Sequence, residues 1–403
     1  MASDTLYDLA FAYKKTRLWK KLYDSEIFAV AMPDGETAYC SAMGQLGDHI
    51  ALGIYVGQAG FDSFRYIMFA AEEDDYSPEV LLSQDCLQCA FENREYLSDQ
   101  EVEEVRRYTK SRGIMLRGPH AWPQFLRYKP RQYPWPCNRE DEARIAEALS
   151  AAIALSDMLD GNRKRDLGLA PLYPEEVEEL ENRSIPLLKR KDGEFVLLRT
   201  DLPEPAEERW PTPEPLDPAT AEKIRALKKQ GIFQCEILWL PAPMQEDETQ
   251  PPAFPAMLLC LDSRQHYILP VEPILNYEEH PERLLSSFTD ALVRENWRPA
   301  AVKVRNSATR ALLEGMCAQC GILLSQEEDL PALEEVREEL LESMSGDDGP
   351  EMEDEALEWL MELSDEDLLS MPEPLSSQIV LMAEQGILPE ALGWRILRIF
   401  GRA

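Results

Sequence analysis

A proline-rich stretch in the middle of the chain limits what this sequence can fold into. Six prolines lie between Pro203 and Pro218. Each proline fixes one backbone dihedral angle and removes an amide donor, so neither a long helix nor a central strand can run through the stretch. Such a segment behaves as a semi-rigid spacer. The sequence therefore predicts a domain boundary here, in a chain whose 403 residues suit two or three domains.

This boundary divides the chain into four segments. We expect an N-terminal α+β module over residues 1–160, followed by a hairpin and the proline-rich linker over 161–218. A second module covers 219–345, and an acidic segment with C-terminal helices covers 346–403. The composition, 44% hydrophobic and 29% charged, is that of a chain that buries a core. The predicted fold class is a multi-domain protein of mixed α+β and α/β character.

Alternating apolar residues and turn dipeptides predict an antiparallel sheet in the first module. Asp34-Gly35 and Asp192-Gly193 are typical of tight hairpin turns. The sequence from Ser98 to Glu101 has the spacing of a capping box, and Gly113 ends the helix that starts there. The expected strands of this module are 26–32, 37–43, 49–56 and 86–91, and its expected helices are 4–23, 62–71, 98–112 and 140–159. The strands expected over 185–189 and 195–200 form the hairpin of the following segment, joined at Asp192-Gly193.

The second module is expected to contain three consecutive strands, then a helix, a strand, a helix, a strand and a helix. This order, βββαβαβα, is that of a ribonuclease-H-like fold. A short helix over 219–230 precedes it, and Ser307 is the expected cap of the helix over 308–320. The expected strands are 233–240, 256–261, 266–271, 300–305 and 322–324, with further helices starting at Pro281 and covering 331–344.

The stretch from Val105 to Arg139 differs in charge from the rest of the chain. It carries nine Lys or Arg and no Asp or Glu, whereas the whole chain has a net charge of −34. Aromatic residues and prolines alternate with these cations. Such a combination can hold phosphates and stack on bases or guanidinium groups. The residues predicted to bind a partner are Arg117, Trp122, Phe125, Arg127, Tyr128, Lys129, Arg131, Tyr133 and Trp135.

A structural interpretation of this stretch stays open beside the functional one. Trp122, Phe125 and Trp135 can equally belong to the core or to an interface between modules, with the arginines lying along the surface. The aromatic residues can also serve the core while the cations serve a partner.

Catalytic chemistry has little support in the sequence. In a ribonuclease-H-like module, two-metal catalysis would need carboxylates at the positions of Glu236, Asn306 and Glu335. Asn306 is an amide, and hard divalent ions prefer charged oxygen ligands, so a degenerate module without catalysis is favoured. Asp262 could replace it as a ligand, but Asp-Ser between two strands is ordinary turn chemistry.

No metal site or cofactor is predicted. The four histidines have no ligand spacing, and neither a phosphate-binding loop nor a nucleophile elbow occurs. Two CxxC pairs are present, Cys86/Cys89 and Cys317/Cys320. The first pair lies in an expected strand, where residues three apart face opposite ways, so a shared zinc ion is not expected.

The acidic residues are concentrated near the C-terminus. Gln326 to Glu373 contains twenty Asp or Glu and one Arg, a net charge of −19. Overall, like charge disfavours nucleic acid as a partner without excluding it. No apolar run approaches the roughly 20 residues of a membrane span, and Met1 to Lys15 lacks the pattern of a signal peptide, which together predict a cytoplasmic protein.

Several stretches resemble an uncharacterised family of bacterial cytoplasmic proteins that joins two modules of unknown function. They are AMPDGETAYCSAMGQLGDHIALGIYVGQAGFDSF, AWPQFLRYKPRQYPWP and RPAAVKVRNSATRALLEGMCAQCGILLSQEEDLPAL. The resemblance spans most of the chain except the linker and the acidic segment. It implies a bacterial source and no activity, cofactor or catalytic residue.

Three functions remain open from the sequence. The first is a non-enzymatic, multi-domain interaction or regulatory protein, whose partner is another protein or the chain's own acidic tail. The second is a nucleic-acid-processing enzyme, or a degenerate relative, built on the second module. The third is an acidic mimic of nucleic acid that occupies a basic protein. If the acidic segment (Gln326 to Glu373) packs near the basic stretch (Val105 to Arg139), it would mask the cations until a partner displaced it.

Overall fold

The computed structural model describes most of the chain. The described residues are 2–47, 49–72, 80, 82–172, 184–206, 209–247, 249–327, 329–345, 363, 368, 379 and 390–400. The chain forms two compact units, Met1–Leu333 and Glu334–Ala403. The fold is of mixed α+β type with several sheets, as the sequence predicts.

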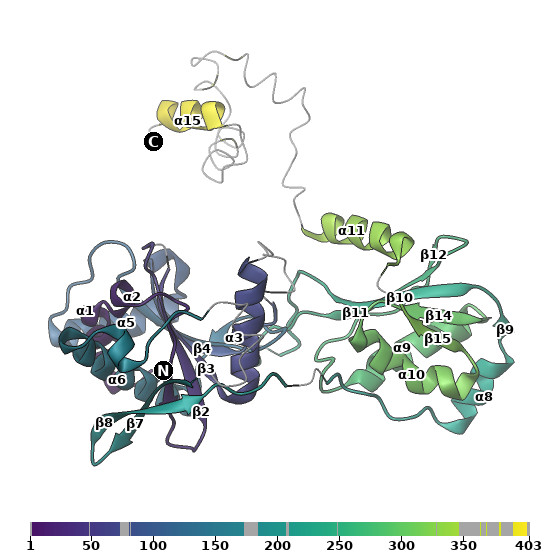
Figure 1. The fold of residues 1–403 in the computed structure, drawn as a ribbon. Coiled ribbons are helices and arrows are strands. Elements are labelled where there is room, and N and C mark those ends of the chain that lie inside the picture. Colours follow the sequence, from purple (N-terminus) through teal and green to yellow (C-terminus); the bar gives the residue numbers. More distant parts are fainter. Residues whose placement is uncertain are drawn as a thin grey trace. The chain divides into compact units, whose positions relative to one another are not determined.

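An eight-stranded sheet organises the N-terminal part of the first unit (Figure 1). Its order is β6-β5-β4-β3-β2-β1-β7-β8, and all neighbouring pairs are antiparallel except β1 and β7. The strands are β1 (Phe28–Ala31), β2 (Thr37–Met43), β3 (Ile50–Val56), β4 (Cys86–Glu92), β5 (Trp122–Tyr128), β6 (Trp135–Pro136), β7 (Ser184–Lys191) and β8 (Glu194–Asp201).

Helices cover both faces of this sheet. The main core lies on one face, under α1 (Asp4–Thr16), α2 (Leu18–Lys21), α5 (Asp99–Arg112) and α6 (Arg139–Gly161). The helix α3 (Gly57–Glu72) lies on the other face (Figure 1). Its Phe61 and Phe64 pack against Tyr39 and Tyr55 of the sheet. Cys86 and Cys89 lie in different clusters, on opposite faces of β4, as the alternation predicts.

The helix expected over residues 4–23 is broken, contrary to the prediction. It ends at Thr16, and Arg17 has a left-handed backbone with φ of 52° before α2 begins. The Thr16 hydroxyl accepts a hydrogen bond from the amide of Leu18 at 3.2 Å, which offers the backbone an alternative to helix continuation. The Arg17 side chain is consequently presented at a corner of the chain.

The second module contains a five-stranded sheet of order β12-β11-β10-β14-β15. β10 is antiparallel to β11 and parallel to β14, and β14 is parallel to β15. The elements follow the expected order along the chain, while the ribonuclease-H-like assignment itself stays a prediction. They are α8 (Pro218–Ala226), β9 (Lys228–Lys229), β10 (Ile232–Trp239), β11 (Ala256–Asp262), β12 (Tyr267–Ile268), α9 (Pro281–Arg294), β13 (Trp297–Arg298), β14 (Ala301–Val304), α10 (Ser307–Cys320), β15 (Leu323–Gln326) and α11 (Pro331–Ser345).

Three predicted boundaries in this module are wrong, since the strand expected over 266–271 is only Tyr267–Ile268 and two others differ for local reasons. The helix expected over 219–230 ends at Ala226, because Lys228 and Lys229 form β9, which pairs with β13. The cap of α10 is Asn306 rather than Ser307, since the Asn306 side chain accepts a hydrogen bond from the amide of Thr309. Helices α8, α9 and α10 together bury one face of the sheet in a single core.

The second unit is described only in part. It contains most of α11 and the helix α15 (Glu390–Ile399). Leu368, Ile379, Leu392 and Ile396 form a small buried cluster there. Among the described residues, no helix is long and apolar enough to cross a membrane.

Candidate functional site

The nine residues predicted to bind a partner do not converge on one surface. Phe125 is buried in the main core, where its ring meets Tyr7 edge-on at 5.4 Å. Arg127 forms an ion pair with the buried carboxylate of Asp141 at 3.3 Å. The Tyr128 hydroxyl donates a hydrogen bond to Gln88 at 3.2 Å. Part of the stretch therefore holds the first module together.

Four of the remaining residues of this set lie on two strands and in the loop between them. Trp122 and Trp135 are half-buried, and the guanidinium of Arg106 lies 5.8 Å from the ring centroid of Trp122. Lys129 and Tyr133 are exposed.

Arg131 joins the first module to the second. Its guanidinium lies over the indole rings of Trp210 and Trp239, at 4.8 and 4.1 Å from their centroids. It also forms an ion pair with Glu278 at 2.7 Å. Its backbone amide donates to the carbonyl of Leu82, and its carbonyl accepts from the amide of Phe254. The side chain and the backbone of one residue thus connect both modules and the linker.

Arg117 belongs to an open groove between the broken N-terminal helix and the segment that follows α5. The groove has a volume of about 430 Å³. Of the ten described residues that line it, four are Lys or Arg and none is Asp or Glu. We call it the basic groove; its lining residues are Phe11, Lys14, Lys15, Arg17, Trp19, Ile114, Met115, Leu116, Arg117 and Ala121.

The cations of the basic groove differ in their availability. Lys14 donates a hydrogen bond to the carbonyl of His120 and lies over the ring of Phe91, and burial lowers its pKa. Lys15, Arg17 and Arg117 are exposed, and none of them forms an ion pair within the part of the chain that the structure describes; Arg117 donates a hydrogen bond to the sulfur of Met115 at 3.5 Å. The groove therefore presents three charges that are available to a ligand.

The floor of the basic groove is apolar. Met115 is 72% exposed, and Ile114, Leu116 and Phe11 are half-buried beside it. Exposed apolar surface bordered by charge is typical of an interaction site. Sequence reasoning identified only Arg117 here, because nothing in the sequence indicates the break at Arg17 that brings the two segments together.

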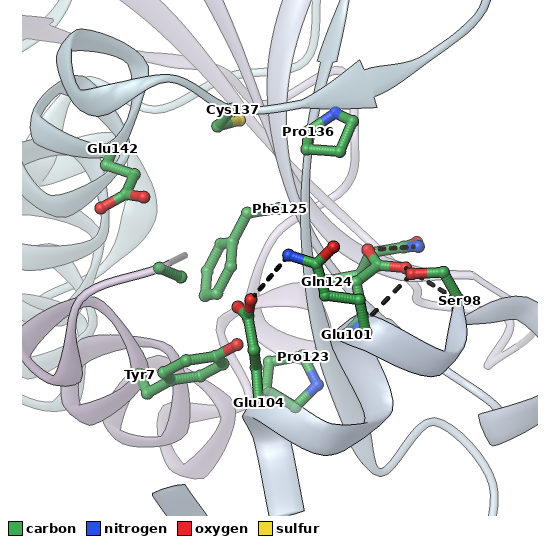
Figure 2. A pocket seen from close by; sticks show the side chains of 12 residues that line it. Tyr7, Ser98, Glu101, Glu104, Pro123, Gln124, Phe125, Pro136, Cys137 and Glu142 are labelled. Carbon is green, nitrogen blue, oxygen red and sulfur yellow. Dashed lines mark hydrogen bonds between the residues drawn. The ribbon is translucent and has the colours of Figure 1, made fainter. Parts of the chain in front are cut away.

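A smaller pocket on the same module is lined by side chains that hydrogen-bond to one another (Figure 2). Its volume is about 110 Å³, and three glutamates line it. Glu101 caps α5 and accepts a hydrogen bond from Gln124, Glu104 accepts one from Gln100, and Glu142 accepts one from the amide of Ser3. Burial and the nearby carboxylates raise the pKa of Tyr7. All three carboxylates have hydrogen-bond partners, so we interpret these residues as stabilising the fold of the first module.

The three residues proposed for two-metal catalysis have other surroundings. Glu236 is buried on β10 and lies 3.8 Å from the guanidinium of Arg305. Asn306 caps α10, and Glu335 is exposed on α11. Asp262 accepts hydrogen bonds from the amides of Arg264 and Gln265, the turn chemistry that its position predicts. The described residues contain no group of three or more potential metal ligands.

Replacing Asn306 tests its role as a cap. Its side-chain oxygen accepts from both the amide and the hydroxyl of Thr309, and that hydroxyl in turn accepts from the amide of Ile237 at 2.8 Å. We expect Asn306→Ala to lower the free energy of unfolding by about 1–2 kcal/mol, whereas Asn306→Asp stays close to wild type. Urea unfolding measures both variants. An alanine variant as stable as the parent would contradict this role.

Comparisons with known proteins identify two domain families in this chain, and neither has an assigned activity. A model of a domain of unknown function, DUF7309, matches residues 4–168. A second such model, DUF6930, matches residues 220–341. No curated protein matches the chain. The chain thus contains two domains of unknown function, as the resemblance implies.

One solved structure shows a distant similarity. It is a chain in the cryo-EM structure of a simian T-cell lymphotropic virus intasome in complex with PP2A regulatory subunit B56 gamma, at 15% identity and a TM-score of 0.22. The match covers 36% of this chain and 48% of that chain. A similarity this weak supports no statement about function.

Proposed function

We propose that this chain of two domains of unknown function is a non-enzymatic interaction protein, and that its basic groove binds an acidic segment of a protein partner. The observation that carries the proposal is the combination of three available cations, Lys15, Arg17 and Arg117, with an apolar floor at Met115. A segment that alternates carboxylates with apolar side chains matches both features. Charge pairing would orient it, and burial of apolar surface would supply affinity.

A protein segment suits the groove better than nucleic acid. Recognition of a nucleic-acid backbone needs many cations along the phosphates, and the basic groove offers three exposed ones. An exposed methionine with neighbouring aliphatic residues has no complement in a phosphate backbone, whereas it packs well against leucine or methionine.

The enzymatic alternative finds less support. Glu236 has a guanidinium beside it at 3.8 Å, and Asn306 is engaged as a cap. A buried glutamate whose charge is already balanced by an arginine is a poor ligand for a divalent ion.

A synthetic peptide with the sequence of residues 351–370 tests the proposal. The peptide contains nine Asp or Glu, no Lys or Arg, and several Leu and Met. We expect saturable binding to the full chain, measured by fluorescence anisotropy, which weakens as salt is raised because the Debye length falls below about 8 Å. Arg117→Glu should weaken binding roughly tenfold, since it removes one attraction and adds one repulsion.

Arg165→Glu is the matched control, because Arg165 is also exposed but lies outside the groove. It should bind the peptide like the parent. If Arg117→Glu and Arg165→Glu weakened peptide binding equally, the effect would come from the overall charge, which would contradict a defined site. Tighter binding of a single-stranded oligonucleotide than of the peptide would favour nucleic acid as the partner instead.

A further inference from the structure

A hollow of about 390 Å³ lies in the first unit where the two modules and the linker meet. Its walls come from α3, from the residues before β4, from Pro130 and Arg131 after β5, and from Trp210 and Trp239. We call it the junction hollow. Small-molecule sites commonly have this size and occur between modules.

One wall of the junction hollow is aromatic and suited to cations. The rings of Trp210 and Trp239 are stacked, with centroids 5.9 Å apart and an angle of 28° between their planes. The guanidinium of Arg131 already lies over both rings, and Glu278 balances its charge at 2.7 Å. The chain's own side chain thus shows that these indole faces accept a planar cation, since the ring face carries negative potential.

Two carboxylates line the same hollow, and they differ in their partners. Asp62 forms an ion pair with Arg65 at 3.5 Å and accepts a hydrogen bond from Gln58. The Asp85 carboxylate has no ion pair with any residue that the structure describes, although its backbone amide donates to the Ser63 hydroxyl at 2.8 Å.

Burial makes the charged form of Asp85 less favourable, an effect that a cation bound in the hollow would offset. It raises the pKa of this carboxyl, even though Arg127 and Lys129 act in the opposite direction from outside the hollow. Arg131 is paired with Glu278 and Asp62 with Arg65, so among the described lining residues Asp85 is the carboxylate that has no ion pair inside the hollow. A single positive charge placed there would replace the lost hydration of this group.

We propose that the junction hollow binds a small organic monocation, a primary ammonium or guanidinium group carried on an aromatic or aliphatic body. Its charged group would pair with Asp85, and its body would lie against Trp210 and Trp239. Such a ligand would touch the same indoles that hold Arg131, and through them the junction between the modules. The proposal is independent of the basic groove.

The experiment uses the full chain and phenethylamine as the probe. This amine is protonated at pH 7.5, and 2-phenylethanol has the same shape without the charge. We expect phenethylamine to change the indole fluorescence saturably and to bind about tenfold or more tightly than 2-phenylethanol, as measured by calorimetry. Equal affinities for the two compounds, or no binding of the amine, would overturn the proposal.

Two variants locate the binding. Asp85→Asn removes the charge but keeps the shape and the backbone hydrogen bond to Ser63, and we expect it to weaken amine binding about tenfold while leaving the alcohol unaffected. Asp201→Asn, an exposed position on β8 outside the hollow, should bind like the parent. Unchanged amine binding in a folded Asp85→Asn protein would contradict the site. If that variant did not fold, the amine-to-alcohol ratio of the unaltered chain would decide.

Discussion

Arg131→Ala is expected to destabilise the first unit by about 2–3 kcal/mol. Each contact of the guanidinium with an indole ring is worth roughly 0.5–2 kcal/mol. The ion pair with Glu278 adds at most about 1 kcal/mol, because the glutamate side chain is 40% exposed. The hydrogen bonds of residue 131 to Leu82 and Phe254 use the backbone and persist in the variant.

Thermal unfolding followed by circular dichroism and tryptophan fluorescence measures this effect. We expect the melting temperature to fall by roughly 5 °C and the fluorescence of the junction indoles to change before the main transition. The melting temperature of Arg131→Lys should lie between those of the parent and Arg131→Ala, since lysine keeps the charge but loses the planar group. Arg165→Ala, at an exposed position, should melt like the parent. An alanine variant with parental stability would mean that the junction is held by the backbone alone.

Deleting Ser345 to Ala403 is expected to raise the affinity of the basic groove for the acidic peptide. We propose that the chain's own acidic segment competes for Lys15, Arg17 and Arg117, because Gln326 to Glu373 carries a net charge of −19 on the same molecule. Tethering gives a weak competitor a high effective concentration, and the deletion removes twelve of the twenty acidic residues of this segment, so peptide binding should tighten by roughly tenfold. The gain should shrink at high salt.

Peptide titration of the truncated and full chains measures this competition. The truncated chain must first show the circular dichroism and melting behaviour expected of a folded first unit. Equal affinities of the two chains would show that the acidic segment does not compete for the basic groove. That result would not contradict peptide binding in the groove itself. Lower affinity in the truncated chain would indicate that the deleted residues help to bind the partner.

Local patterns were sufficient to predict most of the elements. The capping box at Ser98 and Glu101 and the stop at Gly113 both appear in α5. The Asp192-Gly193 hairpin forms with both residues at positive φ, as a tight turn between twisted strands requires. These features depend on residues within a few positions of one another, which is why the sequence alone reveals them.

Long-range arrangements could not be predicted in the same way. The pairing of β1 with β7 joins Ala29 to Leu187, and no local pattern distinguishes that neighbour from any other apolar strand. The break at Arg17 is local, yet the sequence does not indicate it, because it depends on a hydrogen bond from the Leu18 amide to the Thr16 hydroxyl in a sequence that otherwise suits a helix.

The candidate sites also combine features that the sequence predicts with features that only the fold reveals. Arg117 and Arg131 both belong to the stretch that the sequence singles out by charge. Only the fold shows that Arg131 lies over the indole rings of Trp210 and Trp239 while Arg117 forms no ion pair with a described residue. Asp85 could not have been selected from the sequence, because its place in the lining of the junction hollow, without an ion pair to any described residue, is a property of the packed structure.

The most direct test of the proposed function is a methyl NMR measurement at Met115. With ¹³C-methyl-labelled methionine in the full chain, the Met115 signal can be assigned by its loss in Met115→Leu. Met244 is also exposed, at 57%, and lies in the second module, so it serves as an internal reference. Peptide binding in the basic groove should shift the Met115 methyl resonance in proportion to occupancy and leave that of Met244 in place. Saturating peptide that leaves Met115 unshifted, or that shifts both signals alike, would contradict binding in the basic groove.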